Sequence, residues 1–247
     1  MTPTPTPTYV YGLVNADTEL PPNLSGLGPS GRVSTIVHER IAAIVSDVPT
    51  DRPLGTRDDL LAHESVVDAV AKRAAVLPLR FPAVVTETGV VEELLAPHQE
   101  RFLQVLAELD GMVQFTLKGR YERDTVLREI TEADEEIMAL RERVRDVPED
   151  ASYYDRIRLG ELVVAAMEQR RDDDGRQILD RLAPTATDIS TRQLGQPDEV
   201  VNAAFLVARD HAKQFDDAVE EVGRNLAGRV RFRLLGPLAP YDFVPER

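Results

Sequence analysis

The sequence predicts an α+β fold built as two domains. Short segments with alternating apolar and polar residues are typical of strands, and other segments carry apolar residues every three or four positions, as helices do. In the second half, the expected order of strand, helices, strand, strand, helix and strand is the split pattern of ferredoxin-like domains. A chain of 247 residues with 43% hydrophobic content is long enough for two small cores. We place the boundary near Asp110, which gives an N-terminal mixed α+β domain (9–109) and a C-terminal ferredoxin-like domain with inserted helices (110–235).

The N-terminal domain is preceded by an alternating Thr-Pro stretch. Prolines forbid a helix and remove strand donors, so residues 1–8 are expected to form an extended, disordered lead. Residues 9–14 predict the first strand, and residues 32–48 predict two more, with a turn near 38–40 where the apolar pattern breaks. The segment between them is rich in Pro, Gly and Ser and is expected to be a loop.

The first helix is expected to start after Thr56, a capping residue followed by two aspartates in the first turn, and to end before Pro78. Its expected core-facing residues are Leu60, Glu64, Val67, Ala71 and Ala74. Residues 77–85 then predict a short buried strand. Residues 90–109 predict helical structure, in which Pro97 either kinks the helix or begins a second one.

The second half begins and ends with strands that we expect to share a sheet. Residues 112–121 and 229–235 both alternate apolar and polar side chains. After Asp124, one long and mostly solvated helix is expected. Its apolar seam comprises Val126, Ile130, Ala133, Ile137, Leu140 and Val144. A helix over 155–171 and a shorter one over 177–182 are expected to follow.

A hairpin and a last helix complete the expected ferredoxin-like pattern. The hairpin joins residues 185–194 to 199–208 through a turn at 195–197. Its second strand is continuously apolar, which suits a central position in the sheet. The last helix spans 209–226, and the residues that it is expected to bury are Phe215, Val219, Val222 and Leu226.

Charge and composition exclude several classes of function. The chain has 29 Lys and Arg against 43 Asp and Glu, and its net charge of -14 repels nucleic-acid phosphates and anionic lipid. The absence of cysteine excludes disulfides, thiolate metal sites and cysteine nucleophiles, as expected in a reducing cytoplasm. The start has no signal-peptide pattern, and no apolar run approaches the ~20 residues that span a bilayer. We therefore expect protein partners, with no nucleic acid and no membrane.

No catalytic, cofactor-binding or metal-ligating residue is assigned from the sequence. His63 and Glu64 on the first helix resemble half of a zinc-protease motif, but Val67 stands where the second histidine is required. We expect His63 or Glu64 to lie at the edge of the apolar stripe and to hydrogen-bond a neighbouring loop. A metal or general-base role is the less favoured alternative.

Three further features are weaker still as functional sites. The glycines of residues 26–31 are interrupted by proline and no helix follows directly, which disfavours a phosphate cradle. The adjacent acids of residues 172–174 are typical of a solvated charge run, because calcium loops alternate their ligands. The remaining histidines lie in separate segments without ligand spacing: His38, His98 and His211.

Five segments occur in order along the chain: YVYGLV, then HESVVDAV followed by VLPLRFPAVV, then ELDGMVQFTLKGRY, NAAFLVAR and GPLAPYDFV. Together, from Tyr9 to Val244, they resemble the gas vesicle protein family GvpL/GvpF. Two positions depart from the family pattern. Pro82 follows Phe81 where such proteins usually have glycine, and Leu238 stands where an aromatic residue usually follows Gly-Pro. Both departures concern local packing and leave open whether the chain is F-like or L-like.

The resemblance implies a non-enzymatic accessory or minor structural protein of gas vesicles, the gas-filled protein compartments that give microbes buoyancy. Similar proteins are located in the cytoplasm and at the gas vesicle, and need no cofactor. The expected partners are the small hydrophobic shell protein and other accessory proteins. The expected role is to nucleate or cap the growing wall, and we take the exposed face of the 126–144 helix as a candidate docking surface.

The resemblance also implies a role for the C-terminal tail, residues 236–247. In similar proteins this tail lies across both domains as a strap. Its three prolines would lower the entropy cost of an extended strap and disfavour continuation of a sheet or helix. The expected strap residues are Leu238, Tyr241, Phe243 and Val244. The alternative is that the tail completes only the C-terminal core.

Two other functions stay open from the sequence. A ferredoxin-like domain often binds small molecules at domain or subunit interfaces, so a small-molecule-binding regulatory module is the main alternative. An enzyme using His63 and Glu64 is the third.

Overall fold

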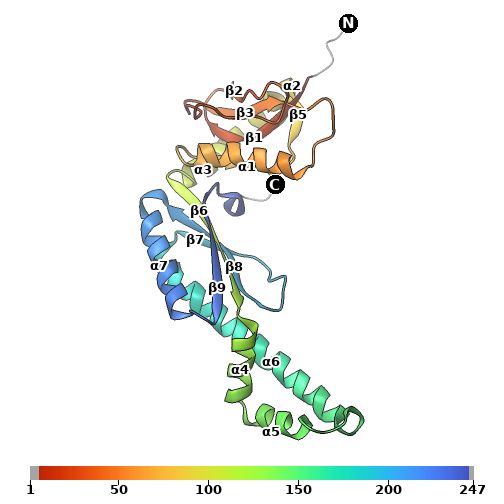
Figure 1. Cartoon of the computed structure of the whole chain (residues 1–247). Coiled ribbons are helices and arrows are strands. Elements are labelled where there is room, and N and C mark those ends of the chain that lie inside the picture. The colour runs from red at the N-terminus through yellow and green to blue at the C-terminus, as the bar shows by residue number, and fades with distance from the viewer. Residues whose placement is uncertain (1–5, 245–247) are drawn as a thin grey trace. The chain divides into compact units, whose positions relative to one another are not determined.

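A computed structural model describes residues 6–244 of the chain (Figure 1). The folded chain forms two compact units. The first unit holds the described residues up to Phe115, together with Leu206–Ala212 and those from Leu235 onward; the second holds Thr116–Phe205 and Lys213–Leu234. Because this division passes through strands, the boundary predicted near Asp110 stays a prediction. Most of the predicted disordered lead, residues 1–5, lies outside the described residues.

The sheet of the first unit is built around β1 (Pro7–Asn15). On one side β1 pairs antiparallel with β3 (Ile41–Asp47), which in turn pairs with β2 (Ser34–His38). On its other side β1 pairs with two short strands, β4 (Leu77–Pro78) and β5 (Val84–Thr86). The three predicted N-terminal strands are confirmed, although β1 begins at Pro7. The single strand predicted over 77–85 is two strands.

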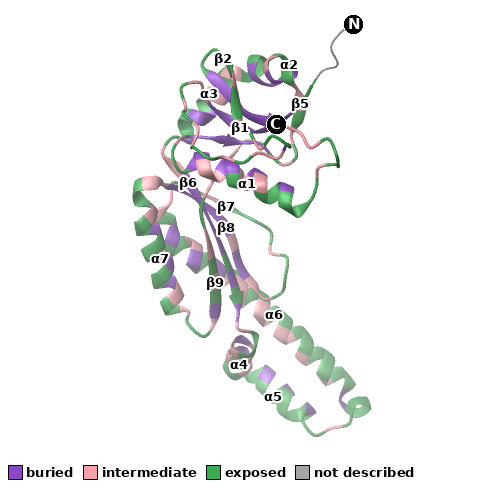
Figure 2. Cartoon of the chain, turned by 45° about the horizontal axis from the view of Figure 1, so that its top comes forward, coloured by how far each residue is buried: buried purple, intermediate pink, exposed green. Residues whose placement is uncertain are grey.

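Residues of β1 contribute to buried clusters on both faces of this sheet, and a register shift between Val10 and Gly12 reverses the alternation, so that Tyr11 and Val14 lie on one face and Val10 and Leu13 on the other. Tyr9 and Tyr11 pack with α1 (Arg57–Ala71) on one face. Val10 and Leu13 pack on the other face with the π-helix η1 (Val90–Leu95) and with α3 (Gln99–Glu108). Two shorter helical segments, α2 (Glu87–Gly89) and η2 (Ala96–His98), precede η1 and α3 in the chain. Figure 2 shows this concentration of buried residues on β1 and β3.

The start of α1 is confirmed, and its predicted core-facing side is confirmed only in part. Thr56 caps the helix in a reciprocal capping box with Asp59. Leu60, predicted to face the core, is 39% exposed, and Glu64 is half-buried. The buried residues of the helix are Asp59, His63, Val66, Val67, Val70 and Ala71. The predicted face is thus right at Val67 and Ala71 and wrong at Leu60, because the buried side is turned toward a histidine and an aspartate that find partners.

The second sheet has the strand order β7-β8-β6-β9. These strands are β6 (Met112–Tyr121), β7 (Asp188–Thr191), β8 (Glu199–Ala208) and β9 (Val230–Leu238). The prediction that β6 and β9 share a sheet is confirmed, and they are neighbours in it; the central position of β8 is confirmed as well. Strand β9 runs three residues beyond the predicted end, through Gly236 and Pro237.

The helices inserted after β6 differ from the prediction in two places. The single helix expected after Asp124 is two helices, α4 (Arg123–Ala133) and α5 (Glu135–Val144). They separate at Asp134, whose backbone is extended and whose side chain accepts hydrogen bonds from the Glu136 and Ile137 amides. Conversely, the two helices expected over 155–171 and 177–182 are one helix, α6 (Glu149–Leu182).

Short helical turns and α7 connect the remaining strands. Turns of 3-10 helix lie at η3 (Ala183–Thr185), η4 (Arg209–His211) and η5 (Tyr241–Phe243). Helix α7 (Ala212–Asn225) buries Phe215, Val219 and Val222 as predicted, whereas Leu226 is half-buried. Among the described residues, no helix is long and apolar enough to cross a membrane.

Candidate functional site

The C-terminal segment, residues 236–244, packs within the first unit. The Ala239 amide donates a 2.8 Å hydrogen bond to Oδ1 of Asp68 on α1, and Ala239 itself is fully buried. This contact with α1 excludes the alternative that the tail completes only the C-terminal core. That the tail lies across both domains stays a prediction.

Strand β6 provides a second anchor for the C-terminal segment. Gln114 Nε2 donates to Asp242 Oδ2 at 2.6 Å, and the Asp242 amide donates back to Gln114 Oε1 at 3.0 Å. Gly236 enters this contact with a φ of 147°, and a Cβ there would lie 2.5 Å from the ring of Phe115. Only glycine fits both the backbone angle and this close approach.

His63 lies at the centre of the aromatic cluster that this segment completes. The side chain is fully buried, and a 2.8 Å hydrogen bond joins its Nδ1 to the Tyr9 hydroxyl. The His63 ring stacks on Tyr11 and lies beside Phe81 and Tyr241, with ring centroids 5.9 Å and 6.2 Å away. The expectation that His63 lies at the edge of the apolar stripe was therefore wrong, because the ring is fully buried and its Nδ1 bonds to Tyr9 on strand β1.

Burial controls the protonation of this cluster. It lowers the pKa of His63 to about 4, an effect that the Leu79 backbone partly offsets. Burial also raises the pKa of the Tyr241 hydroxyl, and the nearby carboxylates Asp68 and Glu64 raise it further. His63 is thus a neutral ring inside a core at neutral pH. Its complete burial disfavours a metal-ligating or general-base role.

The first turn of α1 holds a buried carboxylate. Asp59 is 1% exposed and accepts hydrogen bonds from both terminal nitrogens of Arg52 and from the Gly55 and Thr56 amides. The Arg52 guanidinium is the largest cause of a pKa well below the usual range for Asp59. This network fixes the loop before α1 and leaves the carboxylate no free oxygen for a ligand.

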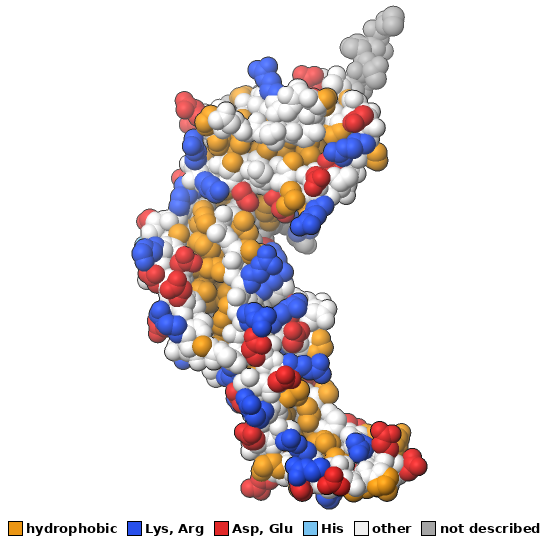
Figure 3. All heavy atoms as spheres, viewed as in Figure 1, with side chains coloured by type: hydrophobic (Ala, Val, Ile, Leu, Met, Phe, Trp, Pro, Cys, Tyr) orange, Lys and Arg blue, Asp and Glu red, His pale blue; other side chains and the backbone are white. Residues whose placement is uncertain are grey.

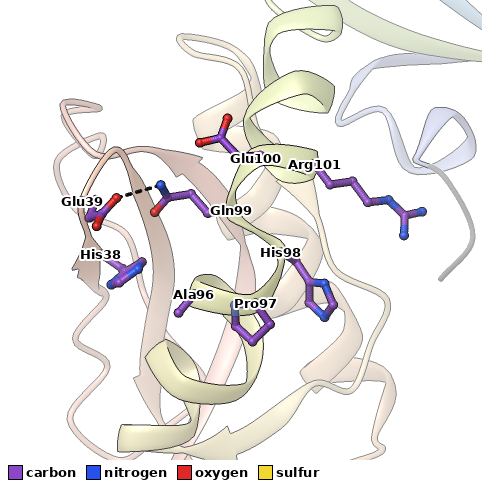
Figure 4. A pocket seen from close by; sticks show the side chains of 8 residues that line it. All are labelled: His38, Glu39, Ala96, Pro97, His98, Gln99, Glu100 and Arg101. Carbon is purple, nitrogen blue, oxygen red and sulfur yellow. Dashed lines mark hydrogen bonds between the residues drawn. The ribbon is translucent and has the colours of Figure 1, made fainter.

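Two hollows on the first unit are open enough to hold a small group. One, of about 320 Å³, lies where β2 meets η2 and brings His38 and His98 to the same pocket (Figure 4). Gln99 points toward Glu39 there and donates a 2.9 Å hydrogen bond to it. The described residues contain no cluster of three or more side chains that could hold a metal ion. The larger hollow, of about 570 Å³, is bordered by Tyr241 and by residues of β4, β5 and the loop between them.

The glycine loop after β1 closes on the protein itself. The Leu27 amide donates to the Tyr11 hydroxyl at 2.8 Å, and the Ser30 amide and hydroxyl both donate to the carboxylate of Asp47. A Cβ on Gly28 would lie 2.2 Å from Asp47. An acidic side chain thus occupies the place where a phosphate would have to bind.

One of the predicted solvated acids is buried. Asp174 is 5% exposed and accepts a 2.6 Å hydrogen bond from the Tyr121 hydroxyl and another from Arg229. Next to it, a Cβ on Gly175 would meet the Val200 carbonyl at 2.8 Å, so α6 approaches β8 closely here. These partners, in β6 and just before β9, are distant in sequence and could not be predicted from the pattern around Asp174. Within this run of acids, Asp174 therefore links α6 to the sheet through hydrogen bonds.

Exposed apolar side chains gather on α6. Tyr153 is 60% exposed, Tyr154 84%, Ile157 43% and Val164 57%. Figure 3 shows hydrophobic side chains among the charges over the helices α4 to α6. On the earlier helices the seam is buried instead: Val126, Ile130, Ile137, Leu140 and Val144 face inward. The apolar surface available to a partner in this unit is thus mainly that of α6, which the sequence analysis did not single out.

The fold and these surfaces define a two-unit α+β protein with a buried histidine cluster and an exposed apolar helix face. A sequence model described as "Gas vesicle synthesis protein GvpL/GvpF" matches residues 7–245. The chain belongs to this family.

Relatives from several microbes are similar over nearly the whole chain. Gas vesicle protein F of Streptomyces sp. (strain CB03234) is 33% identical over 243 residues, which cover 96% of this chain and 99% of that protein. Gas vesicle protein L of the same strain is 30% identical, with 96% and 92% covered. The crystal structure of GvpF from Anabaena sp. PCC7120 has a TM-score of 0.83 at 23% identity and covers 98% of this chain and 99% of that one. GvpF from Microcystis aeruginosa gives a TM-score of 0.77 at 23% identity, with 98% and 100% covered. The structures establish the fold.

Proposed function

We propose that this chain is a non-enzymatic accessory protein of gas vesicle assembly, located in the cytoplasm and at the vesicle. It binds the small hydrophobic shell protein, and other accessory proteins, and helps to nucleate or cap the wall. The family match over residues 7–245 supports the role in gas vesicles. The observation that supports direct binding is the group of exposed apolar side chains on α6.

The proposal has a simple physical basis. A wall that holds gas and excludes water presents an apolar face, so its subunit is prone to aggregate until it is assembled. An accessory protein that shields this subunit needs an apolar contact surface and must stay dispersed itself. The net charge of -14 supplies repulsion between copies of this chain, and α6 supplies apolar surface.

Co-expression with the small shell protein tests the proposal. We compare the amount of shell protein that stays in solution and co-elutes on size exclusion with and without this chain. The expected result is a shared peak that is absent when the shell protein is expressed alone. If the shell protein pellets equally in both cases, direct binding of the shell protein is wrong.

A second candidate function is a small-molecule-binding regulatory module. The hollow of about 570 Å³ beside Tyr241 supports it, because its volume is in the range of small-molecule sites and most of its lining is apolar. Native mass spectrometry of the purified chain tests it. A bound metabolite at one copy per chain, lost on narrowing the hollow with Ala83→Leu, is the expected result; a ligand-free mass overturns it.

A further inference from the structure

Part of α6 presents a regular apolar stripe to solvent. Tyr153, Ile157, Gly160 and Val164 follow one another at spacings of four, three and four residues. This spacing puts their side chains on one side of the helix, as in the seam of a coiled coil. Each of the four is exposed, with 43% to 60% of the surface of the three larger residues accessible. This side of α6 is therefore an apolar seam that no other helix of residues 6–244 covers, although α4 and α5 pack elsewhere on α6.

Gly160 at the middle of this stripe has no structural reason within the chain. Glycine inside a helix is less favourable than alanine. The other glycine of α6, Gly175, is explained because its missing Cβ makes room for the Val200 carbonyl. A Cβ on Gly160 would meet nothing within 4 Å among the described residues. A glycine in a seam allows a second helix to approach closely, and this is the advantage that would offset its cost.

The charges along the stripe indicate what kind of helix would fit. Glu161 and Glu168 lie along one side of it, both exposed and, among the described residues, without an ion-pair partner. The nearby cations are already engaged: Arg158 pairs with Glu136, and Arg170 with Glu129. The stripe is thus an apolar seam with unpaired carboxylates beside it. Its complement is an apolar helix face flanked by Lys or Arg.

We propose that this stripe, Tyr153 to Val164 with Glu161 and Glu168 beside it, binds an amphipathic helix of the small shell protein whose apolar face is flanked by basic residues. The partner helix crosses α6 at Gly160. The inference rests on the proposed function and adds the surface and the chemistry of its partner. A second copy of this chain is a poorer occupant, because an antiparallel pair would bring the two rows of carboxylates together.

Two pairs of variants in the co-expression assay test the surface. Ile157→Gln with Val164→Gln is expected to reduce the co-eluting shell protein about tenfold or more, because both side chains lie at the centre of the contact. The matched control is Leu60→Gln with Leu61→Gln, two exposed leucines of α1 that are 39% and 49% accessible. The control is expected to bind like the wild-type chain. Far-UV circular dichroism verifies that each variant is folded.

The carboxylates are tested by reversing their charge. Glu161→Lys with Glu168→Lys is expected to weaken binding and to reverse its dependence on salt, so that adding salt no longer weakens the complex. The control reverses two exposed acids on other helices, Glu132 and Glu221, and keeps the same net charge. Unchanged binding in the α6 pair, or equal loss in the control pair, overturns the role of these carboxylates.

The possible outcomes separate the two proposals. If the wild-type chain does not retain the shell protein, the proposed function and this surface both fail. If the wild-type chain retains it and the Ile157/Val164 variant does so equally, only the surface is wrong. Light scattering on the free chain adds a third outcome. A dimer that becomes monomeric in the Ile157/Val164 variant assigns the stripe to a second copy and overturns the shell-protein partner.

Discussion

Helices α1 and α6 differ in what covers their aromatic and apolar side chains. On α1, His63 is fully buried, and the chain's own C-terminal segment contributes Tyr241 to the rings around it. On α6, Tyr154 keeps 84% of its surface exposed and Val164 57%. Helix α1 is thus covered in part by the C-terminal segment of the same chain. Tyr154 and Val164 have no such cover among the described residues.

This difference indicates which side chains contribute to the stability of the folded chain and which are available for binding. A side chain that is buried in the folded chain contributes to the free energy of unfolding, whereas an exposed one contributes little to it and remains available to a partner. Removing a side chain around α1 should therefore lower the free energy of unfolding, whereas removing an exposed side chain of the α6 stripe should change binding and leave that free energy nearly unchanged.

The largest expected contrast is between two tyrosines. Tyr241→Ala removes a ring from the His63 cluster and is expected to lower the free energy of unfolding by about 3 kcal/mol. Tyr154→Ala removes a ring that is 84% exposed, and its expected effect is below about 0.5 kcal/mol. Urea denaturation of the full chain measures both. Equal decreases in the free energy of unfolding would show that Tyr154 is covered in the folded chain as much as Tyr241 is.

Acid is expected to destabilise the α1 side specifically. The folded pKa of His63 is lowered to about 4, below the unfolded value of 6.5, so the unfolded chain binds more protons between these values. Stability is therefore full above pH 6.5 and is lost as the pH falls toward 4. The expected loss at pH 5 is about 2 kcal/mol.

The variant His63→Gln isolates this effect. Burial raises the pKa of Asp68 and Glu64, and these carboxyls act with the opposite sign, so the comparison between wild type and variant is the informative quantity. Urea denaturation at pH 7 and pH 5 should show a smaller pH-dependent loss in the variant than in the wild type. Parallel losses in the two chains would contradict a neutral buried His63.

The hydrogen bond between the C-terminal segment and α1 predicts a smaller effect. Asp68→Ala leaves the amide of the fully buried Ala239 without its acceptor, which is expected to cost about 1 to 2 kcal/mol. Asp68→Asn keeps an oxygen that can accept this bond and should be close to wild type. The matched substitution on α6, Glu161→Ala, should be neutral in the same denaturation measurement. A loss in Asp68→Asn as large as in Asp68→Ala would show that the carboxylate charge, not the acceptor, matters.

Much of the fold was accessible from sequence because period-two alternation is a local signal. The strands around Phe115 and Phe232 follow from it directly, and the central position of β8 follows from its continuously apolar sequence. Helix boundaries were less accessible. Asp134 lies inside a continuous apolar seam, and nothing in that seam shows that its side chain will cap a new helix. The acids around Asp174 suggested a break, yet the helix continues because Tyr121 and Arg229, distant in sequence, satisfy that carboxylate.

The two surfaces compared above were hard to predict for one shared reason. The spacing of Tyr153, Ile157 and Val164 is visible in the sequence. However, an apolar seam has the same sequence pattern whether other parts of the chain cover it or not. Likewise, His63 interrupts an apolar pattern and was placed at its edge, because the ring of Tyr241 that covers it comes from residues far along the chain. What covers a helix face is a tertiary property, and periodicity shows only that the face exists.

The smallest expected effect is also the one that distinguishes the two helices most directly, because it has opposite signs in stability and in binding. Gly160→Ala should raise the free energy of unfolding by about 1 kcal/mol, since alanine favours the helix and its Cβ meets nothing within 4 Å. The same methyl group would lie between α6 and a helix crossing at Gly160, so it should reduce the shell protein that co-elutes. Gly175→Ala is the control: its Cβ would be 2.8 Å from the Val200 carbonyl, so it should destabilise the chain. If Gly160→Ala stabilises the chain and leaves binding unchanged, the partner does not approach α6 at this glycine. If it destabilises the free chain, the stripe is already covered by the chain itself, and the contrast with α1 disappears.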